Sequence, residues 1–232
     1  MTESQQAVRA FYDRVYREHG LTDASWIYQR TIQLLQPRSG SRLLDVACGE
    51  GQLLLYASRA KLIATGLDLS IEALRRARTR CPEARLIVGD GGELPFHDAA
   101  FDYVTNLGSL EHFRDMGQGL DEMLRVLKPT GRACLLLPNA FWLGSILEVW
   151  RTGDHGAGWQ IIDRSAPAKQ WQRLLEEHGL VVQRLLPYNR PVKLFDERRR
   201  LRSLRKFIWR GVLNACTPFH LSWHFLFLCV KR

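Results

Sequence analysis

The stretch LLDVACGEGQLL, residues 43–54, decides the fold of this chain. An apolar run ends in an acidic and a small residue, a Gly-x-Gly pair follows, and an apolar helical pattern begins. This order is typical of a strand, a tight loop and a helix. Glycine lacks the Cβ that would keep a ligand from the backbone, and a helix start presents unpaired N–H groups. The stretch therefore predicts a ligand-binding turn at the carboxyl end of a strand in an open α/β sheet.

A second acidic residue ends the next apolar run. Asp68 closes the run 61–68, about 20 residues after the glycines, which suits a carboxylate that binds a ribose. Its two oxygens can accept hydrogen bonds from both ribose hydroxyls. Ser70 is the better candidate to cap the following helix, which would leave Asp68 free for this role. The third glycine of the dinucleotide fingerprint is absent, because Leu54 stands there.

Strand and helix patterns alternate along the rest of the chain. Apolar runs predict strands over 42–47, 62–67, 85–88, 101–106, 132–137, 180–186 and 225–231. Helical spacing predicts helices over 4–19, 23–35, 51–60, 70–80, 117–127 and 167–178. The alternation indicates a parallel sheet with right-handed crossovers. Two segments fall outside it, 139–165 and 187–222, and each follows a strand end where a substrate lid would lie.

Over roughly residues 40–140 the chain resembles the class I S-adenosylmethionine-dependent methyltransferases. The resemblance rests on ordered motifs, namely 43–51, GLDLS at 66–70, GDGGELPF at 89–96, FDYV at 101–104, SLEH at 109–112 and RVLKPTGR at 125–132. It implies an α/β, Rossmann-like fold with a seven-stranded, mostly parallel sheet, helices on both faces, and an antiparallel last strand inserted beside the sixth. We expect a single domain over 1–232, with N-terminal helices in 1–40, a cofactor-binding core in 41–138 and lid insertions at about 139–165 and 187–222.

The resemblance implies S-adenosyl-L-methionine as cofactor, S-adenosyl-L-homocysteine as product, and no metal. Asp45 would lie near the methionine moiety, Asp68 on the ribose and Asp90 at the adenine amino group. The other cofactor contacts expected from the family are Ala47, Gly49, Gly51, Leu69, Gly91, Asn106, Leu107, Tyr12 and Tyr16. Asn106 could instead hold its own turn, and the two tyrosines could instead pack in the core.

Three residues are candidates for the chemistry. Methyl transfer from a sulfonium is an in-line displacement that depends largely on positioning, but an oxygen nucleophile benefits from a base, and imidazole has a suitable pKa. His112, in the Leu-Glu-His motif, is therefore a candidate base, with a structural role at a helix start as the alternative. Asp154 and His155 lie in a glycine-rich stretch. Each could be a base or a substrate contact, or part of a plain loop.

The net charge of +9 is concentrated in one segment. Residues 184–210 hold ten basic and two acidic side chains, hence +8. Such a patch suits a membrane surface, a phosphorylated substrate or nucleic acid. Within it, 197–213 places leucine, isoleucine and valine on one face among arginines, a pattern of interfacial helices. We therefore expect peripheral membrane contact through 197–213, with a solvated helix that covers the sheet as the alternative.

Composition favours a cytoplasmic protein. The five cysteines are scattered without a Cys-x-x-Cys pair, which predicts a reduced compartment and no metal site. Charged residues among the first thirteen disfavour a signal peptide, and no apolar run has the length of a membrane span. If 197–213 binds lipid, the expected place is the inner face of the membrane.

These features favour methylation of a small-molecule, hydrophobic or lipid-linked acceptor, at oxygen rather than at nitrogen or carbon. The apolar stretch 141–150 could line a pocket for such an acceptor or belong to the core. An alternative is methylation of RNA or another nucleic acid. It is disfavoured because residues 106–109 read Asn-Leu-Gly-Ser where base-amino methyltransferases carry Asp/Asn-Pro-Pro-Tyr. A non-catalytic cofactor-binding protein is a further alternative, which the intact glycines and carboxylates disfavour.

Overall fold

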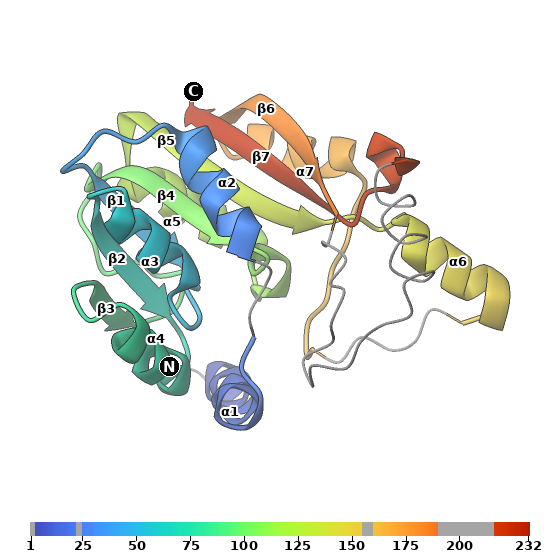
Figure 1. Cartoon of the computed structure of the whole chain (residues 1–232), viewed down its shortest axis with the longest axis horizontal. Helices are drawn as coiled ribbons and strands as arrows, with labels where there is room; N and C mark the ends of the chain where they lie inside the picture. The colour runs from blue at the N-terminus through green and yellow to red at the C-terminus, as the bar shows by residue number, and fades with distance from the viewer. Residues whose placement is uncertain (1–2, 22–24, 155–159, 190–215) are drawn as a thin grey trace.

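A computed structural model describes residues 3–21, 25–154, 160–189 and 216–232. A seven-stranded sheet with the order β3-β2-β1-β4-β5-β7-β6 forms its middle layer (Figure 1). The strands are β1 Arg42–Val46, β2 Ile63–Asp68, β3 Arg85–Val88, β4 Phe101–Leu107, β5 Leu127–Pro138, β6 Leu180–Tyr188 and β7 His224–Lys231. β1 to β5 pair in parallel, and β7 pairs antiparallel with both β5 and β6. The predicted fold class is confirmed, including the last strand inserted beside the sixth.

Helices cover both faces of the sheet. They are α1 Glu3–Glu18, α2 Ser25–Leu35, α3 Gln52–Arg59, α4 Ile71–Arg80, α5 Met116–Val126, α6 Leu143–Thr152 and α7 Ala168–Glu177, with short 3-10 turns η1 Leu110–His112 and η2 Phe219–Leu221. One apolar core lies under α2, α3 and α4 and includes Ile27 and Leu53. The other lies under α5 and α7 and includes Leu120 and Trp171. Two opposed cores of this kind hold the strand ends in fixed positions.

Most predicted elements are present within a few residues of their expected bounds. Two differ. β5 begins at Leu127 rather than 132, because Leu127 pairs with Phe101 before a register shift in β4. α6 was not predicted, since the sequence pattern placed 143–152 in a lid segment without regular structure. The predicted interfacial segment 197–213 lies outside the described residues.

Helix α6 extends away from the sheet beyond the end of β5, at the right of Figure 1. It follows Pro138, the last residue of β5. Within the described ranges, no helix combines the length and apolar character that a membrane crossing requires.

Candidate cofactor and acceptor site

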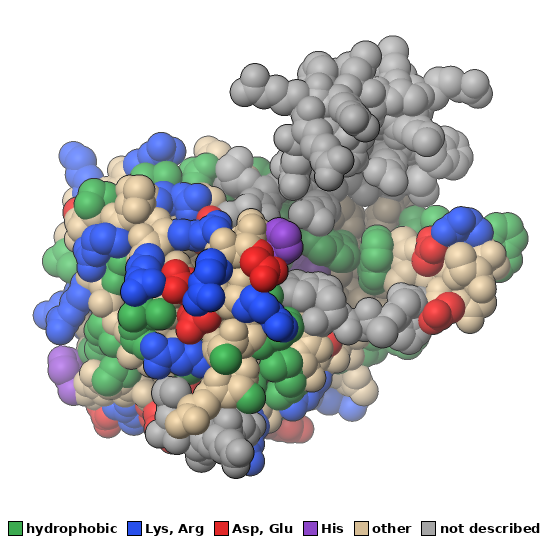
Figure 2. All heavy atoms as spheres, turned by 90° about the horizontal axis from the view of Figure 1, so that it is seen from below, with side chains coloured by type: hydrophobic (Ala, Val, Ile, Leu, Met, Phe, Trp, Pro, Cys, Tyr) green, Lys and Arg blue, Asp and Glu red, His purple; other side chains and the backbone are tan. Residues whose placement is uncertain are grey.

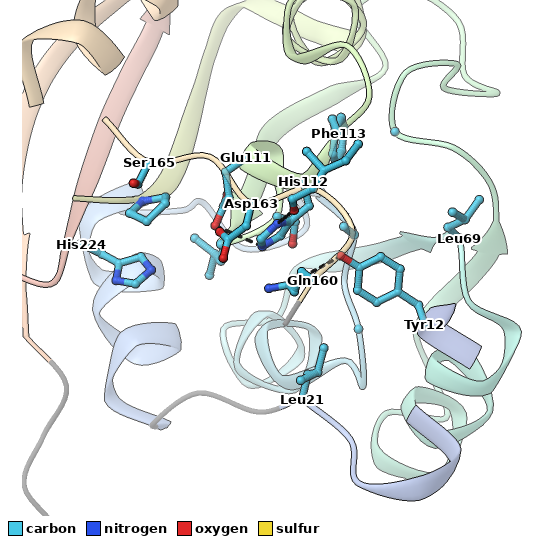
Figure 3. A pocket seen from close by; sticks show the side chains of 18 of the residues that line it. Tyr12, Leu21, Leu69, Glu111, His112, Phe113, Gln160, Asp163, Ser165 and His224 are labelled. Atoms are coloured by element: carbon cyan, nitrogen blue, oxygen red, sulfur yellow. Dashed lines mark hydrogen bonds and ion pairs between the residues drawn. The ribbon is translucent and has the colours of Figure 1, made fainter. Parts of the chain in front are cut away.

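A cavity of about 1060 Å³ opens where the carboxyl ends of β1 to β5 meet, beneath α1. Small-molecule sites range from about 300 to 1,000 Å³, so this volume suits two ligands side by side. Figure 3 shows Tyr12 and Leu69 on one side of the cavity and Ser165 and His224 on the opposite side. Glu111, His112 and Asp163 lie between them. We call the side of β1 to β3 the cofactor side and the side of α6 and β7 the acceptor side.

The glycine loop turns sharply between β1 and α3. Ala47, Gly49 and Gly51 have φ values of 58°, 52° and 74°, in the left-handed region that favours glycine. Ala47 and Gly49 line the cavity, whereas Gly51 does not. Gly51 lies under α4 instead, where an added Cβ would meet the Cβ of Ala77 at 3.0 Å. Gly51 therefore shapes the loop, and its expected contact with the cofactor stays a prediction.

We expect Gly51→Ala to destabilise the fold by roughly 2–5 kcal/mol. The left-handed backbone costs about 1–2 kcal/mol for a residue with a Cβ, and the contact with Ala77 adds about 1–3 kcal/mol of overpacking. Gly40→Ala is the matched control, since Gly40 has a φ of 79° but no atom within 4 Å of the added Cβ. Urea unfolding of both variants measures the difference. Equal destabilisation would show that packing against α4 contributes nothing.

Asp68 ends β2 and is held by two backbone groups. Gly49 N–H donates to Oδ2 and Ser70 N–H donates to Oδ1, each at 2.8 Å. The prediction that Ser70 caps α4 is confirmed, since its hydroxyl accepts from Ala73 N–H, while its backbone N–H binds Asp68. Each carboxylate oxygen can accept further hydrogen bonds. The loop therefore fixes the orientation of a cavity-lining carboxylate.

A second buried carboxylate, Asp45 on β1, lines the same side of the cavity. The Thr105 hydroxyl donates to its Oδ1 at 2.7 Å. Burial raises the pKa of Asp45 to about 7, against the lowering effect of that hydrogen bond. Burial likewise raises the pKa of Asp68 to about 6, against the lowering effect of the Ser70 and Gly49 N–H groups. Burial disfavours the ionised form of both carboxylates, so the site favours a ligand that carries positive charge or hydrogen-bond donors.

Asp90 follows β3 and is tied to helix α1. The Gln5 side-chain amide donates to Asp90 Oδ2 at 2.8 Å, and Gly92 N–H donates to Oδ1 at 2.9 Å. A second tie from α1 runs across the cavity, where the Tyr12 hydroxyl donates to Gln160 at 2.7 Å (Figure 3). Helix α1 therefore covers the cofactor side, and Gln5 fills a donor position on the carboxylate predicted to receive the adenine amino group.

The structure brings most of the predicted cofactor residues together. The cavity-lining members of that set are Tyr12, Tyr16, Asp45, Ala47, Gly49, Asp68, Leu69, Asp90, Gly91 and Leu107. Asn106 does not line the cavity and is fully buried. Its amide donates to Val46 O at 3.1 Å, and its Oδ1 accepts from Leu110 N–H at 2.9 Å. Asn106 thus holds the turn after β4, as in the alternative interpretation of its role.

His112 lies in η1, in the middle of the cavity wall. Its Nδ1 lies 2.6 Å from Ile162 O, and its Nε2 lies 3.6 Å from Glu111 Oε1. In the neutral ring, a proton on Nδ1 donated to this carbonyl leaves the lone pair on Nε2. Burial lowers the pKa of His112, which favours that neutral form. The arrangement can accept a proton at Nε2, beside a carboxylate that would stabilise the resulting cation.

Asp154, one of the other two predicted catalytic residues, does not join His112. Asp154 follows the end of α6, is exposed and does not line the cavity. The Thr152 hydroxyl donates to its backbone carbonyl at 2.7 Å. His155 lies outside the described residues. The expectation of a base in the glycine-rich stretch is therefore not matched by the position of Asp154.

Several lining residues on the acceptor side were not predicted. They are Glu111, Gln160, Asp163, Ser165, Trp223 and His224. Glu111 stands in the Leu-Glu-His motif and could have been singled out there. The others lie in segments with no motif and reach the cavity through the tertiary fold, so the sequence carries no local signal for them.

The acceptor side has an apolar wall on and just before α6. Trp142, Ile146 and Val149 line the cavity and recur at helical spacing. No side chain of α6 is buried, so the alternative that 141–150 belongs to the core is wrong for this helix. In the described part of the chain, no cluster of His, Cys, Asp or Glu side chains is arranged to hold a metal ion.

Comparison with known proteins agrees with this geometry. Residues 44–135 match the family model described as a methyltransferase domain. A demethylmenaquinone methyltransferase from Corynebacterium kroppenstedtii is 32% identical over 140 residues, covering 57% of this chain and 60% of that protein. A 27-O-demethylrifamycin SV methyltransferase from Amycolatopsis mediterranei is 36% identical over 162 residues, covering 65% and 58%.

A solved structure shows the same fold. The geranyl diphosphate C-methyltransferase from Streptomyces coelicolor, in complex with Mg²⁺, geranyl diphosphate and S-adenosyl-L-homocysteine, superposes with a TM-score of 0.68 at 15% identity, covering 100% of this chain and 99% of that one. The chain spans about three fifths of the length of the two curated relatives, 60% and 58%. Residues 44–135 therefore match a methyltransferase domain, and the curated relatives named here are methyltransferases, in agreement with the resemblance that the sequence motifs carry.

Proposed function

We propose that this protein is an S-adenosylmethionine-dependent methyltransferase that methylates an oxygen atom of a small hydrophobic acceptor. The observation that carries the proposal is the pair of buried cavity carboxylates, Asp45 and Asp68, beside a left-handed glycine loop. Ionised carboxylates in this position suit a ligand with ribose hydroxyls and a sulfonium cation. S-adenosylmethionine, when bound, supplies an electrophilic methyl group on such a sulfonium.

In this proposal the described residues hold the cofactor on the side of β1 to β3. Asp68 would accept hydrogen bonds from the ribose hydroxyls, Leu69 would pack on the adenine, and Asp90 would accept from the adenine amino group. Gly91 leaves no space for a side chain, because an added Cβ would meet the Phe113 ring. Asp45 lies toward the methionine part, and α1 excludes water from above through Tyr12 and Tyr16.

The acceptor would lie against the apolar wall of Trp142, Ile146 and Val149. Two observations support a hydrophobic, quinone-like acceptor: this wall, and the curated relatives named for demethylmenaquinone and 27-O-demethylrifamycin SV. Glu111 and Asp163 also line this part of the cavity, and their negative charge would repel an anionic acceptor. An uncharged hydroxyl compound fits both features.

His112 would serve as the general base. Nε2 takes the proton of the acceptor hydroxyl as the oxygen attacks, and the Ile162 carbonyl keeps the ring in the required orientation through Nδ1. Glu111, 3.6 Å from Nε2, stabilises the imidazolium that results. The remaining rate enhancement comes from positioning the hydroxyl in line with the methyl group.

The nucleic-acid alternative gains no support from the described surface. Figure 2 shows Lys and Arg interspersed with Asp and Glu on the face it presents. On α4, Arg75 lies 2.8 Å from Glu72, and Arg76 and Arg80 lie 3.0 and 3.1 Å from Glu50. Basic groups that are already paired are poorly placed to bind phosphates.

The cytoplasmic location and the single domain over 1–232 stay predictions.

We expect cofactor binding to release protons near pH 6–7, because Asp45 and Asp68 have pKa values of about 7 and about 6. Both values lie above the ordinary carboxyl value of about 3.9, so the ligand-free fold loses stability as the pH rises through this range. A bound cation lowers both pKa values, and affinity therefore rises with pH. Calorimetry in two buffers of different ionisation enthalpy measures the protons. Proton uptake, or an affinity independent of pH, would count against the assignment.

A transfer assay tests the function itself. The purified full chain is incubated with methyl-labelled S-adenosylmethionine and an extract of the cells that make it, followed by solvent partition. Label in the organic phase as a methoxy product is the expected result. Label confined to RNA would replace the acceptor by nucleic acid and keep the cofactor. Cofactor binding without transfer to any fraction would favour the non-catalytic alternative.

A further inference from the structure

Helix α6 is the most exposed apolar element of the described structure. None of its side chains is buried, and Trp150, near its end, is 85% exposed. Figure 2 shows the helix as a lobe at the right, set apart from the main body, with hydrophobic side chains on its surface. An apolar helix that projects into water in this way indicates an interaction surface.

Two apolar stripes run along α6, and they have different surroundings. The inner stripe, Trp142, Ile146 and Val149, lines the cavity. The outer stripe consists of Leu143, Leu147 and Trp150, spaced four and three residues apart so that they share a face. None of the three lines the cavity. The cavity therefore accounts for the inner stripe and leaves the outer stripe unexplained.

The sequence that joins β6 to η2 is strongly basic. Between Asn189 and Cys216 it carries nine Lys or Arg and two Asp or Glu residues. Both ends of this stretch are anchored beside the start of α6. Trp223 N–H donates to Asn189 Oδ1 at 2.9 Å, and the Asn139 amide donates to His220 O and Ser222 O at 2.8 Å. The described chain therefore stops at Asn189 and resumes at Cys216 with its anchored ends beside the start of α6, and the sequence between them carries an excess of positive charge.

We propose that the outer stripe of α6 inserts into the surface of an anionic lipid bilayer. Tryptophan favours the boundary between headgroups and acyl chains, where Trp150 would lie. The basic residues in the sequence between Asn189 and Cys216 are attracted to anionic lipid, which favours a bilayer over an apolar protein surface as the occupant. The next step rests on the proposed function: the inner stripe receives a hydrophobic acceptor that leaves the same bilayer.

Vesicle co-sedimentation of the full chain tests this proposal. Vesicles of phosphatidylcholine alone are compared with vesicles that also contain phosphatidylglycerol. The outer-stripe variant Leu147→Ser/Trp150→Ser is matched by the inner-stripe variant Ile146→Ser/Val149→Ser on the same helix. We expect wild type and the inner variant to bind the anionic vesicles, and the outer variant to bind at least about tenfold more weakly. Added salt should weaken the binding of wild type.

Equal vesicle binding by the outer variant and wild type would overturn the proposal. Failure of the wild type to bind anionic vesicles would also overturn the proposal. If the wild type then proved to be a dimer that the outer variant dissociates, the outer stripe would be assigned to contact with a second copy of the chain. Cofactor binding by calorimetry serves as the folding control for each variant. Because vesicle binding requires no methyl acceptor, its result is read separately from the outcome of the transfer assay.

Discussion

Replacing Asp68 by asparagine should weaken binding of S-adenosylmethionine by at least about 100-fold. Hydrogen bonds to a charged group contribute about 1.5–3 kcal/mol each, and the proposed site gives Asp68 two ribose hydroxyls. In the wild type, Gly49 N–H and Ser70 N–H each donate to the carboxylate at 2.8 Å. The asparagine side chain would place its own N–H donors against one of these two N–H groups, which is unfavourable. Isothermal titration calorimetry at pH values above the carboxyl pKa of about 6 measures the loss.

Asp102→Asn is the matched control for this prediction. Asp102 also accepts from a backbone N–H, that of Arg42 at 2.9 Å, and from Lys128 Nζ at 2.6 Å, but it lies near the start of β4 and does not line the cavity. We expect its loss to lower stability and to leave cofactor affinity within about twofold. If Asp68→Asn binds as tightly as wild type, the assignment of the ribose to Asp68 is wrong.

Replacing His112 by alanine should lower kcat by about 10²–10⁴-fold, the usual contribution of a general base, while cofactor affinity changes little. In the wild type, kcat should rise with pH through the pKa of His112, since the neutral ring accepts the proton. Because burial lowers that pKa, the rising limb should lie below the ordinary imidazole value of about 6.5. Single-turnover kinetics with labelled cofactor separate this step from binding.

His97→Ala provides the comparison, because His97 is exposed and its Nδ1 lies 2.9 Å from the neighbouring carbonyl of Asp98. Its kcat and pH profile should match those of wild type. A His112→Ala enzyme with full kcat would reduce His112 to a structural residue at η1. The reaction would then depend on positioning alone.

The parts of the fold that depend on local signals were predictable from sequence. The glycine loop, Ser70 as a cap and the positions of the strands along the chain follow from short patterns, whereas the place of the antiparallel last strand was implied by the family resemblance. The departures come from contacts between distant segments. The Asn106 amide donates to Val46 O on another strand, 60 residues away in the chain, and no spacing in the sequence reveals this contact.

The acceptor side was the least predictable part of the site. The apolar side chains of α6 share one face of the helix, but part of that face lines the cavity and part does not, and the sequence pattern alone does not separate the two. Asp163 and Gln160 follow it in a segment without motif or period, and they reach the cavity because Ala166 N–H pairs with Pro138 O and brings this segment back to the end of β5.

A crystal structure of the full chain with S-adenosyl-L-homocysteine tests the central claim most directly. We predict that its ribose hydroxyls lie within hydrogen-bond distance of Asp68, that its adenine amino group replaces Gln5 as a donor to Asp90, and that its sulfur faces the part of the cavity lined by Glu111 and His112. A ligand bound elsewhere, or bound in this cavity without contact to Asp68, would contradict the account.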